Sequence, residues 1–261
     1  MKHWTEKLFI ERSDLFLKVM NERWERTEDL VNGMVKILNT YGIASGNVLD
    51  LCCGNGRVSI YMAKKGFRVV GVDMSEPFLA DANKKAREHR VADRVTFLEG
   101  DVRKLKEVVG KIAEPFDMVV SVWTSIGFFS QQDDLRTFKQ ARELSRDSAI
   151  LFLADTMHSE YLSLKFTPTS YADFGDVVLL ENRSYDVTTS QVSTTWSFYK
   201  KLGENLMFVD KIDLKHHIYS ISELSSLLRK SGWEPVNFYG NLSTLQPMNS
   251  LTRMDIVAKA C

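Results

Sequence analysis

The stretch from Val48 to Ile60, VLDLCCGNGRVSI, decides the fold of this chain. Its apolar start predicts a buried strand, a glycine turn follows, and the residues from Arg57 onward predict a helix. Gly54 and Gly56 allow a sharp bend and let a ligand approach the backbone without a Cβ in the way. A strand, glycine turn and helix in this order are typical of nucleotide-binding α/β folds, although one G-x-G is weak evidence alone.

The segments after this unit alternate between short strands and amphipathic helices. Further strands are predicted at FRVVGVD (67–73), VTFLEGD (95–101), FDMVVSV (116–122) and AILFLAD (149–155). Because each crossover in such a series returns over a face of the sheet, these strands should be parallel. Near the C-terminus, Ser220 and Glu223 form a predicted capping box that opens a last helix, and two more strands close the chain.

The alternation of strand and helix stops between residues 158 and 217. Polar and apolar residues take turns there in VVLLENRSYDV, QVSTTWSFYKK and NLMFVDKIDLKHH, which predicts an antiparallel meander. We therefore expect N-terminal helices over the ligand site (1–45), a core (46–157 and 218–261) and an inserted antiparallel lid (158–217).

Composition narrows the class of protein. The 261 residues include 34 Lys and Arg and 34 Asp and Glu, so the formal net charge of +0 supplies no general attraction for nucleic acid or an acidic membrane. No run approaches the roughly 20 apolar residues of a spanning helix, and the polar start lacks a signal-peptide core. Three cysteines without paired spacing suit a reducing compartment, and no metal-ligand spacing occurs. We expect a cytoplasmic protein with no metal and a small or locally recognised partner.

Three acidic residues stand at predicted strand ends, where open α/β sheets bind their ligands. Asp50 lies just before the glycine turn, where it would repel a diphosphate but suit a cationic ligand. Asp73 can accept both hydroxyls of a ribose, and Asp101 with the backbone of Val102 could recognise an adenine edge. Ser59 stands where a dinucleotide fold has its third glycine. These features oppose a nicotinamide-dependent oxidoreductase.

Four motifs in this order resemble those of the class I S-adenosylmethionine-dependent methyltransferases. VLDLCCGNGR is similar to motif I, VVGVDMS to the ribose motif, FLEGDV to the adenine motif and FDMVVSVWTSIGFF to the fourth-strand motif. HHIYSISELSSLLRKSGW with FYGN resembles the end of small-molecule members that carry a β-hairpin lid. The resemblance implies a doubly wound, Rossmann-like, seven-stranded and mostly parallel sheet with an antiparallel lid insertion, and S-adenosylmethionine as the cofactor.

The resemblance also implies a set of donor-binding residues. They are Asp50, Cys52, Gly54, Gly56, Asp73, Met74, Asp101, Val102 and Trp123. Cys52 departs from the family pattern because it replaces the usual first glycine of motif I. Together with Cys53 it is interpreted as a small packing thiol rather than a redox pair.

Acceptor-side candidates follow the fourth strand and end the insertion. Trp123 and Thr124 are expected where donor and acceptor meet, and the absence of an Asn or Asp followed by two prolines there argues against methylation of a base's exocyclic amine. His216, His217 and Tyr219 are the catalytic candidates, as a general base or as substrate hydrogen-bonding groups. Strict alternation puts His216 on one face and His217 with Tyr219 on the other, but does not say which face looks inward.

The sequence favours transfer of a methyl group to an N or O atom of a small-molecule acceptor. One alternative is a protein or RNA substrate, which a basic patch could support, although a solvated charged face is the preferred interpretation. That patch would consist of Arg87, Arg90, Arg94 and Arg103. Another is a non-catalytic module that binds the donor. The identity of the acceptor and the choice between monomer and homodimer stay open.

Overall fold

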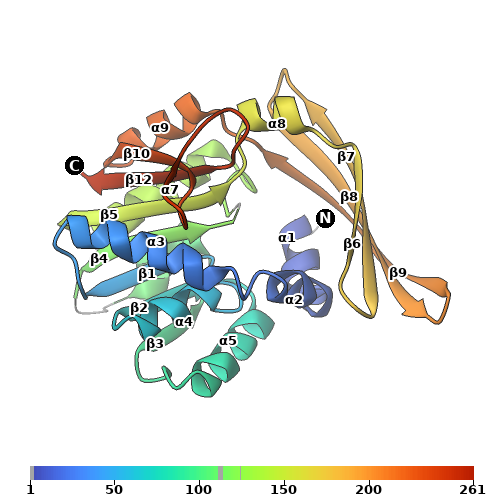
Figure 1. Cartoon of the computed structure of the whole chain (residues 1–261), viewed down its shortest axis with the longest axis horizontal. Helices are drawn as coiled ribbons and strands as arrows, with labels where there is room; N and C mark the ends of the chain where they lie inside the picture. The colour runs from blue at the N-terminus through green and yellow to red at the C-terminus, as the bar shows by residue number, and fades with distance from the viewer. Residues whose placement is uncertain (1–2, 111–113, 124) are drawn as a thin grey trace.

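The computed structural model describes residues 3–110, 114–123 and 125–261, and within them the chain forms two sheets (Figure 1). Among these residues, the core sheet has eight strands in the order β11-β10-β12-β5-β4-β1-β2-β3, and the inserted sheet has four in the order β6-β7-β8-β9. The core strands are β1 (Asn47–Leu51), β2 (Arg68–Asp73), β3 (Val95–Glu99), β4 (Phe116–Val122), β5 (Ser145–Thr156), β10 (Trp233–Asn241), β11 (Gln246–Pro247) and β12 (Met254–Ala260). The inserted strands are β6 (Thr169–Asp173), β7 (Val177–Asp186), β8 (Gln191–Leu202) and β9 (Asn205–His217).

Helices precede the core sheet and connect its strands. They are α1 (Trp4–Glu6), the π-helix η1 (Lys7–Glu11), α2 (Ser13–Asn21), α3 (Thr27–Thr40), α4 (Arg57–Lys64), α5 (Glu76–Glu88), the 3₁₀-helix η2 (Val102–Lys104), α6 (Leu105–Val109), α7 (Gln131–Glu143), α8 (Ser159–Lys165) and α9 (Ile221–Lys230). Ser220 and Glu223 form the predicted capping box of α9. In the described part of the chain, no helix has the length and apolar character needed to span a lipid bilayer.

The core sheet is mostly parallel, as predicted. Strand β1 pairs in parallel with β2 and β4, so that Leu49 lies opposite both Val70 and Val119. Strand β12 runs the other way, since it pairs antiparallel with both β5 and β10, and the short β11 pairs antiparallel with β10. The two-residue β11 adds one strand to the seven predicted. The α/β fold with an antiparallel insertion is therefore confirmed.

Helices cover both faces of the core sheet, which makes the fold doubly wound (Figure 1). Successive side chains of a strand point to opposite faces, so Val48 and Val120 pack with α3 and α4, whereas Leu49 and Val119 pack with α6, α7 and α9. All four side chains are fully buried. This burial on both faces fixes the parallel strands, and their carboxyl ends meet at one edge.

The N-terminal segment fills the space between the two sheets (Figure 1). The helices predicted within residues 1–45 are a short α1, a π-helical turn, α2 and α3. Leu8, Phe16 and Met20 from this segment form one buried cluster with Phe78 of α5 and Leu214 of the inserted sheet. The segment therefore holds the inserted sheet to the core through apolar packing.

The insertion opens with a helix, where the sequence pattern predicted antiparallel structure from residue 158. His158 is fully buried, and its Nδ1 accepts a hydrogen bond of 3.3 Å from the backbone N–H of Tyr161. This side chain caps α8, so a helix starts where strand alternation was expected.

The end of the inserted sheet is fixed to the core by a buried carboxylate. Asp134 of α7 accepts hydrogen bonds from the Tyr219 hydroxyl at 2.6 Å and from the N–H of Gly127 at 2.9 Å. The N–H of His217 donates in turn to the carbonyl of Gly127 at 2.8 Å. Burial raises the pKa of Asp134 to about 6, so the group is ionised and still hydrogen-bonded at slightly alkaline pH.

We expect Tyr219→Phe to lower the free energy of unfolding at slightly alkaline pH by about 1.5–3 kcal/mol, the typical value of a hydrogen bond to a charged group. Urea denaturation monitored by tryptophan fluorescence measures this change. Tyr171→Phe is the matched control because Tyr171 is 75% exposed. Equal stability of the two variants would contradict the role assigned to Asp134.

Candidate functional site

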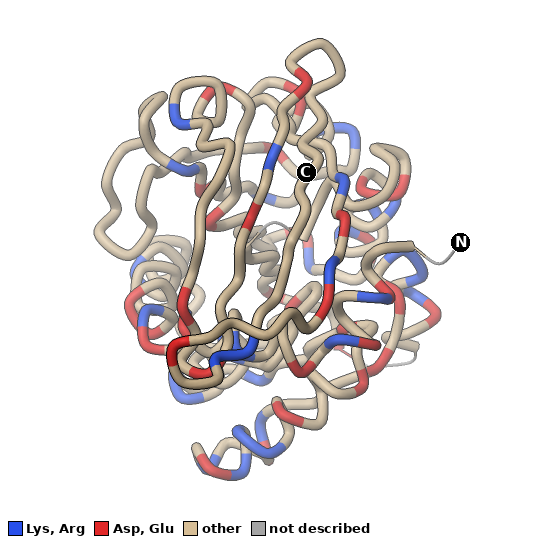
Figure 2. The backbone as a smooth tube through the Cα atoms, turned by 90° about the vertical axis from the view of Figure 1, so that its right-hand side faces the viewer, with Lys and Arg blue, Asp and Glu red and all other residues tan. Residues whose placement is uncertain are grey.

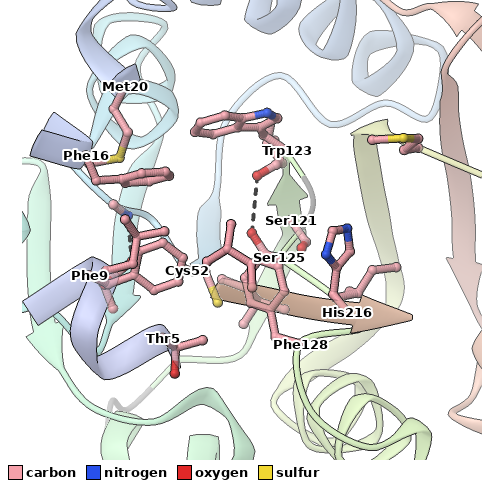
Figure 3. Close-up of a pocket in the computed structure, with 18 of the residues that line it drawn as sticks. Thr5, Phe9, Phe16, Met20, Cys52, Ser121, Trp123, Ser125, Phe128 and His216 are labelled. Carbon is pink, nitrogen blue, oxygen red and sulfur yellow. Dashed lines mark hydrogen bonds between the residues drawn. The ribbon is translucent and has the colours of Figure 1, made fainter. Parts of the chain in front are cut away.

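A cavity of about 450 Å³ lies at the carboxyl edge of the core sheet, bounded also by the N-terminal segment and the inserted sheet. Figure 3 shows side chains from all three parts converging on it. Of the predicted donor-binding residues, those at the cavity wall are Asp50, Cys52, Gly54, Asp73, Met74, Asp101, Val102 and Trp123. The structure thus brings the three acids from β1 and from the ends of β2 and β3 to one space.

Asp50 lies near the end of β1, just before the glycine turn, and lines the cavity. Asp50 is only 2% exposed, and the Ser59 hydroxyl donates a hydrogen bond of 2.6 Å to its Oδ2. Burial raises the pKa of this carboxyl to about 7. Cys52 and Gly54 both adopt a left-handed φ of +55°, so a thiol-bearing residue takes the backbone conformation that glycine usually supplies.

Gly56 differs from the other predicted donor-binding residues because it does not line the cavity. Its φ of +75° completes the turn into α4, and a Cβ built on it would lie 2.8 Å from Phe97 and 2.9 Å from Ala82. The glycine is therefore needed for close packing of the turn against β3 and α5, and its role toward a ligand is indirect.

Asp73 connects the glycine turn to the loop after β2. The N–H of Gly54 donates to its Oδ2 at 2.8 Å, and the N–H of Ser75 donates to its Oδ1 at 3.0 Å. Burial raises the pKa of Asp73 to about 6 despite these two bonds. Each carboxylate oxygen can accept a further hydrogen bond, so the group keeps capacity for a pair of ligand hydroxyls.

Asp101 is more exposed than the other two acids and has a cationic partner. The guanidinium of Arg103 donates to both carboxylate oxygens, at 2.9 Å from Nε to Oδ1 and 2.6 Å from Nη2 to Oδ2. Burial alone would raise the pKa of Asp101, but the hydrogen bonds and charge of Arg103 together hold it below its usual value. Arg103 was interpreted as part of a solvated face; it lines the cavity instead and lies over the Phe129 ring.

Asn55 was not singled out from the sequence, although it stands between the two glycines. Its side chain is 1% exposed and lines the cavity. Its Nδ2 donates to Asn21 at 3.0 Å, whereas its buried Oδ1 has no hydrogen-bond partner in the described part of the chain. A buried carbonyl oxygen without a partner is costly unless a ligand supplies a donor.

These residues fit the S-adenosylmethionine that the family resemblance implies. The cavity offers an acceptor pair at Asp73 for the ribose, and acceptors at Asp50 and Asn55 for an ammonium. Its acidic wall suits a sulfonium and disfavours a diphosphate. No group of three or more His, Cys, Asp or Glu side chains within the described ranges could hold a metal ion.

A column of stacked rings forms another part of the cavity wall. Trp123 has a φ of +64°, and Phe16 of α2 stacks on it with ring centroids 5.5 Å apart. Phe16 also stacks on Trp196 of the inserted sheet at 5.9 Å, and the Arg23 guanidinium lies 4.1 Å from the Trp123 ring. The column therefore joins α2, β4 and β8. Thr124, predicted beside Trp123, lies outside the described residues.

The sequence pattern did not single out the residues that the N-terminal segment contributes to this wall. They are Trp4, Thr5, Leu8, Phe9, Phe16, Met20 and Arg23. The sequence predicted helices in residues 1–45 but not what their side chains would contact. An excess of aromatic side chains in this segment was the available signal, since such side chains supply large contact area to a site.

The three catalytic candidates separate in the structure. His216 lines the cavity (Figure 3), and its ring lies edge-on to that of Phe128 with the ring centroids 6.2 Å apart. His217 does not line the cavity, and its Nε2 lies 3.2 Å from Nε2 of Gln131. Tyr219 is buried with its hydroxyl bound to Asp134, so it corrects the expectation of a substrate-facing tyrosine. The alternation was predicted, and the face that points inward is the one with His216.

Electrostatics distinguish His216 further. Burial, with a smaller effect of the neighbouring His217, lowers the pKa of His216 to about 4. The imidazole is therefore neutral near pH 7 and keeps a nitrogen lone pair that can accept a hydrogen bond.

The strands of the inserted sheet carry charges of both signs. In Figure 2, which views the inserted sheet from outside, acidic and basic positions are interspersed along its strands. Of the arginines considered as a basic patch, Arg103 is paired with Asp101 and Arg94 donates to the carbonyl of Gly66 at 3.3 Å.

Comparison with known proteins gives the same assignment. Residues 48–148 match the methyltransferase domain family. The chain is 27% identical to the predicted methyltransferase YqeM of Bacillus subtilis (strain 168), over 80% of this chain and 82% of YqeM.

Two solved structures share the fold. One is an S-adenosylmethionine-dependent methyltransferase from Clostridium acetobutylicum ATCC 824, with a TM-score of 0.73, 16% identity, and coverage of 89% of this chain and 91% of that one. The other is S-adenosylmethionine-bound CalS10, an amino pentose methyltransferase from Micromonospora echinaspora, with a TM-score of 0.67, 15% identity, and coverage of 91% and 92%.

The family match spans the glycine turn and the strands that end at Asp73 and before Asp101. S-adenosylmethionine is accordingly the cofactor. The chain is a class I S-adenosylmethionine-dependent methyltransferase, and residues 48–148 are its methyltransferase domain.

Proposed function

We propose that the chain moves the methyl group to an N or O atom of a small-molecule acceptor held between the core and the inserted sheet. The observation that carries this proposal is the continuity of the cavity, which runs from Asp50 and Asp73 to His216 on the inserted sheet. The N-terminal segment lines the same space, and its volume of about 450 Å³ is in the range of small-molecule sites. This size favours a small molecule over a protein or RNA chain.

The donor half of the cavity orients S-adenosylmethionine in this proposal. Asp73 accepts hydrogen bonds from the ribose hydroxyls, and Asp101 with the backbone of Val102 recognises the adenine. Asp50 and Asn55 face the ammonium. When bound, the cofactor supplies a methyl group on a positively charged sulfur, which an acceptor lone pair can attack directly.

The acceptor half aligns the nucleophile and excludes water. Holding two reactants in line can contribute roughly 7–11 kcal/mol to lowering the barrier, so the chain needs no strong base. The neutral His216 accepts a hydrogen bond from the N–H or O–H of the methyl acceptor. This bond orients the lone pair of the acceptor atom toward the methyl donor. The N-terminal segment and the inserted sheet act as the lid, with Trp123 and Phe16 as the aromatic wall.

Methyl labelling of a cell extract tests whether the acceptor is a small molecule. We expect the purified protein, given S-adenosylmethionine labelled in the methyl group and a cell extract, to put the label into the small-molecule filtrate. Asp73→Ala, which loses the donor site, is the control. Label recovered in the protein or RNA fraction would overturn the proposal in favour of a macromolecular substrate.

Donor affinity should depend on pH through the two buried acids. Their carboxylate forms bind the ribose hydroxyls and the ammonium, and their pKa values are raised to about 6 for Asp73 and about 7 for Asp50. Calorimetric affinity for S-adenosylhomocysteine should therefore be highest at alkaline pH and fall as the pH drops through 7 and 6. Asp73→Asn should weaken binding about tenfold or more at alkaline pH, the equivalent of about 1.5–3 kcal/mol, and remove the step near pH 6. Asp93→Asn, an exposed residue, is the control; a flat profile in the wild type would refute the assignment.

The two neighbouring histidines give a direct test of the acceptor side. His216→Leu should lower the initial rate of small-molecule labelling about tenfold, which corresponds to the loss of one hydrogen bond of about 1.4 kcal/mol. Affinity for S-adenosylhomocysteine should not change. His217→Leu, on the opposite face, should change the rate by less than about twofold. A larger effect at His217 than at His216 would reverse the assignment.

A further inference from the structure

The inner face of the inserted sheet carries a charged pair that donor binding does not explain. Directly opposed residues of antiparallel strands share a face, and the inward rows are mostly apolar, as at Leu179 with Phe198. Glu181 and Arg183 occupy the next inward positions of β7 and line the cavity. They form an ion pair between Arg183 Nη2 and Glu181 Oε2, with side chains only 26% and 14% exposed for Arg183 and Glu181 respectively.

The strand register places this pair close to the expected reaction centre. Arg183 pairs with Thr194 of β8, and Thr194 pairs with Leu214 of β9, two residues before His216. With strands about 4.8 Å apart and about 3.3 Å per residue, the Cα atoms of Arg183 and His216 are about 12 Å apart on the same face. A ligand that contacts both side chains has to bridge this span.

Stability does not account for the pair. Withdrawing two charges from water costs several kcal/mol per ion, and their attraction often fails to recover this. Burial lowers the pKa of Arg183, in agreement with such a cost. Charged groups at a cavity wall are therefore better explained by a ligand that hydrogen-bonds to them.

The pair keeps unused hydrogen-bonding capacity. Glu181 Oε2 accepts from the Ser170 hydroxyl at 2.9 Å, and Arg183 Nη1 donates to the carbonyl of Thr167 at 3.3 Å. Within the described ranges, Oε1 of Glu181 accepts no hydrogen bond. A guanidinium has five N–H donors, so Arg183 also retains donors. The pair offers acceptors and donors side by side and has no net charge.

Building on the proposed function, we propose that Glu181 and Arg183 bind two neighbouring hydroxyl groups of the acceptor. A hydroxyl both donates and accepts, so it can donate to the carboxylate and accept from the guanidinium together. A neutral ion pair gives no Coulomb preference for an anion or a cation. The acceptor is therefore an uncharged polyhydroxylated ring that carries its nucleophilic N or O atom on the side facing His216.

The test measures binding to protein saturated with S-adenosylhomocysteine, by ligand-observed NMR at mildly alkaline pH. The probes are glucosamine, cyclohexylamine, which has the amine without hydroxyls, and glucosamine 6-phosphate, which adds an anion. Glucosamine should bind at millimolar concentration and more tightly than cyclohexylamine. Glu181→Gln and Arg183→Met should each weaken glucosamine about tenfold and leave cyclohexylamine and S-adenosylhomocysteine unchanged. Lys211→Met, at an exposed position of β9, is the charge-removal control.

Several outcomes would overturn the hydroxyl site. One is equal binding of glucosamine and cyclohexylamine, and another is no binding of glucosamine at millimolar concentration. A third is much tighter binding of glucosamine 6-phosphate that depends on Arg183 alone, which would indicate an anion site. Failure of S-adenosylhomocysteine to bind the wild type is a different result, because it would refute the donor site and not this pair alone.

Discussion

The buried Asp73 carboxylate is the interaction on which the site depends. It accepts one backbone N–H from the glycine turn after β1 and another from the loop after β2. These bonds hold two adjacent strand ends in one geometry and aim the remaining lone pairs at the cavity. Burial raises the pKa of Asp73 because it destabilises the ionised carboxylate. A ligand with hydroxyl donors stabilises that carboxylate through hydrogen bonds.

The second constraint is that neither sheet can enclose the cavity alone. The core supplies acids at its carboxyl edge, and the inserted sheet supplies a mostly apolar inner face. The N-terminal segment fills the gap through the column of Phe16 between Trp123 and Trp196. The core side and the inserted-sheet side of the cavity are therefore joined through one cluster of rings.

Because the inserted sheet is pleated, alternate residues point toward the cavity and away from it. The inward rows hold His216, Glu181 and Arg183, whereas His217 and Tyr219 serve the junction with α7. A one-residue change of register would exchange these roles, because side chains alternate with a period of two. The buried Asp134 and the close contact at Gly127 fix that register.

The sequence by itself determined the glycine turn, the parallel core and the strand-end positions of Asp50, Asp73 and Asp101, because these follow from local periodicity and from the common edge of parallel strands. Tertiary structure alone decided that His216 faces inward, that Tyr219 binds Asp134, that Arg103 pairs with Asp101 and that Phe16 reaches Trp196. Alternation along a strand is symmetric between its two faces, and only packing against elements distant in the chain removes that symmetry. The sequence likewise predicted helices in the N-terminal segment but could not identify the rings that they contact, since those contacts join residues more than a hundred positions apart.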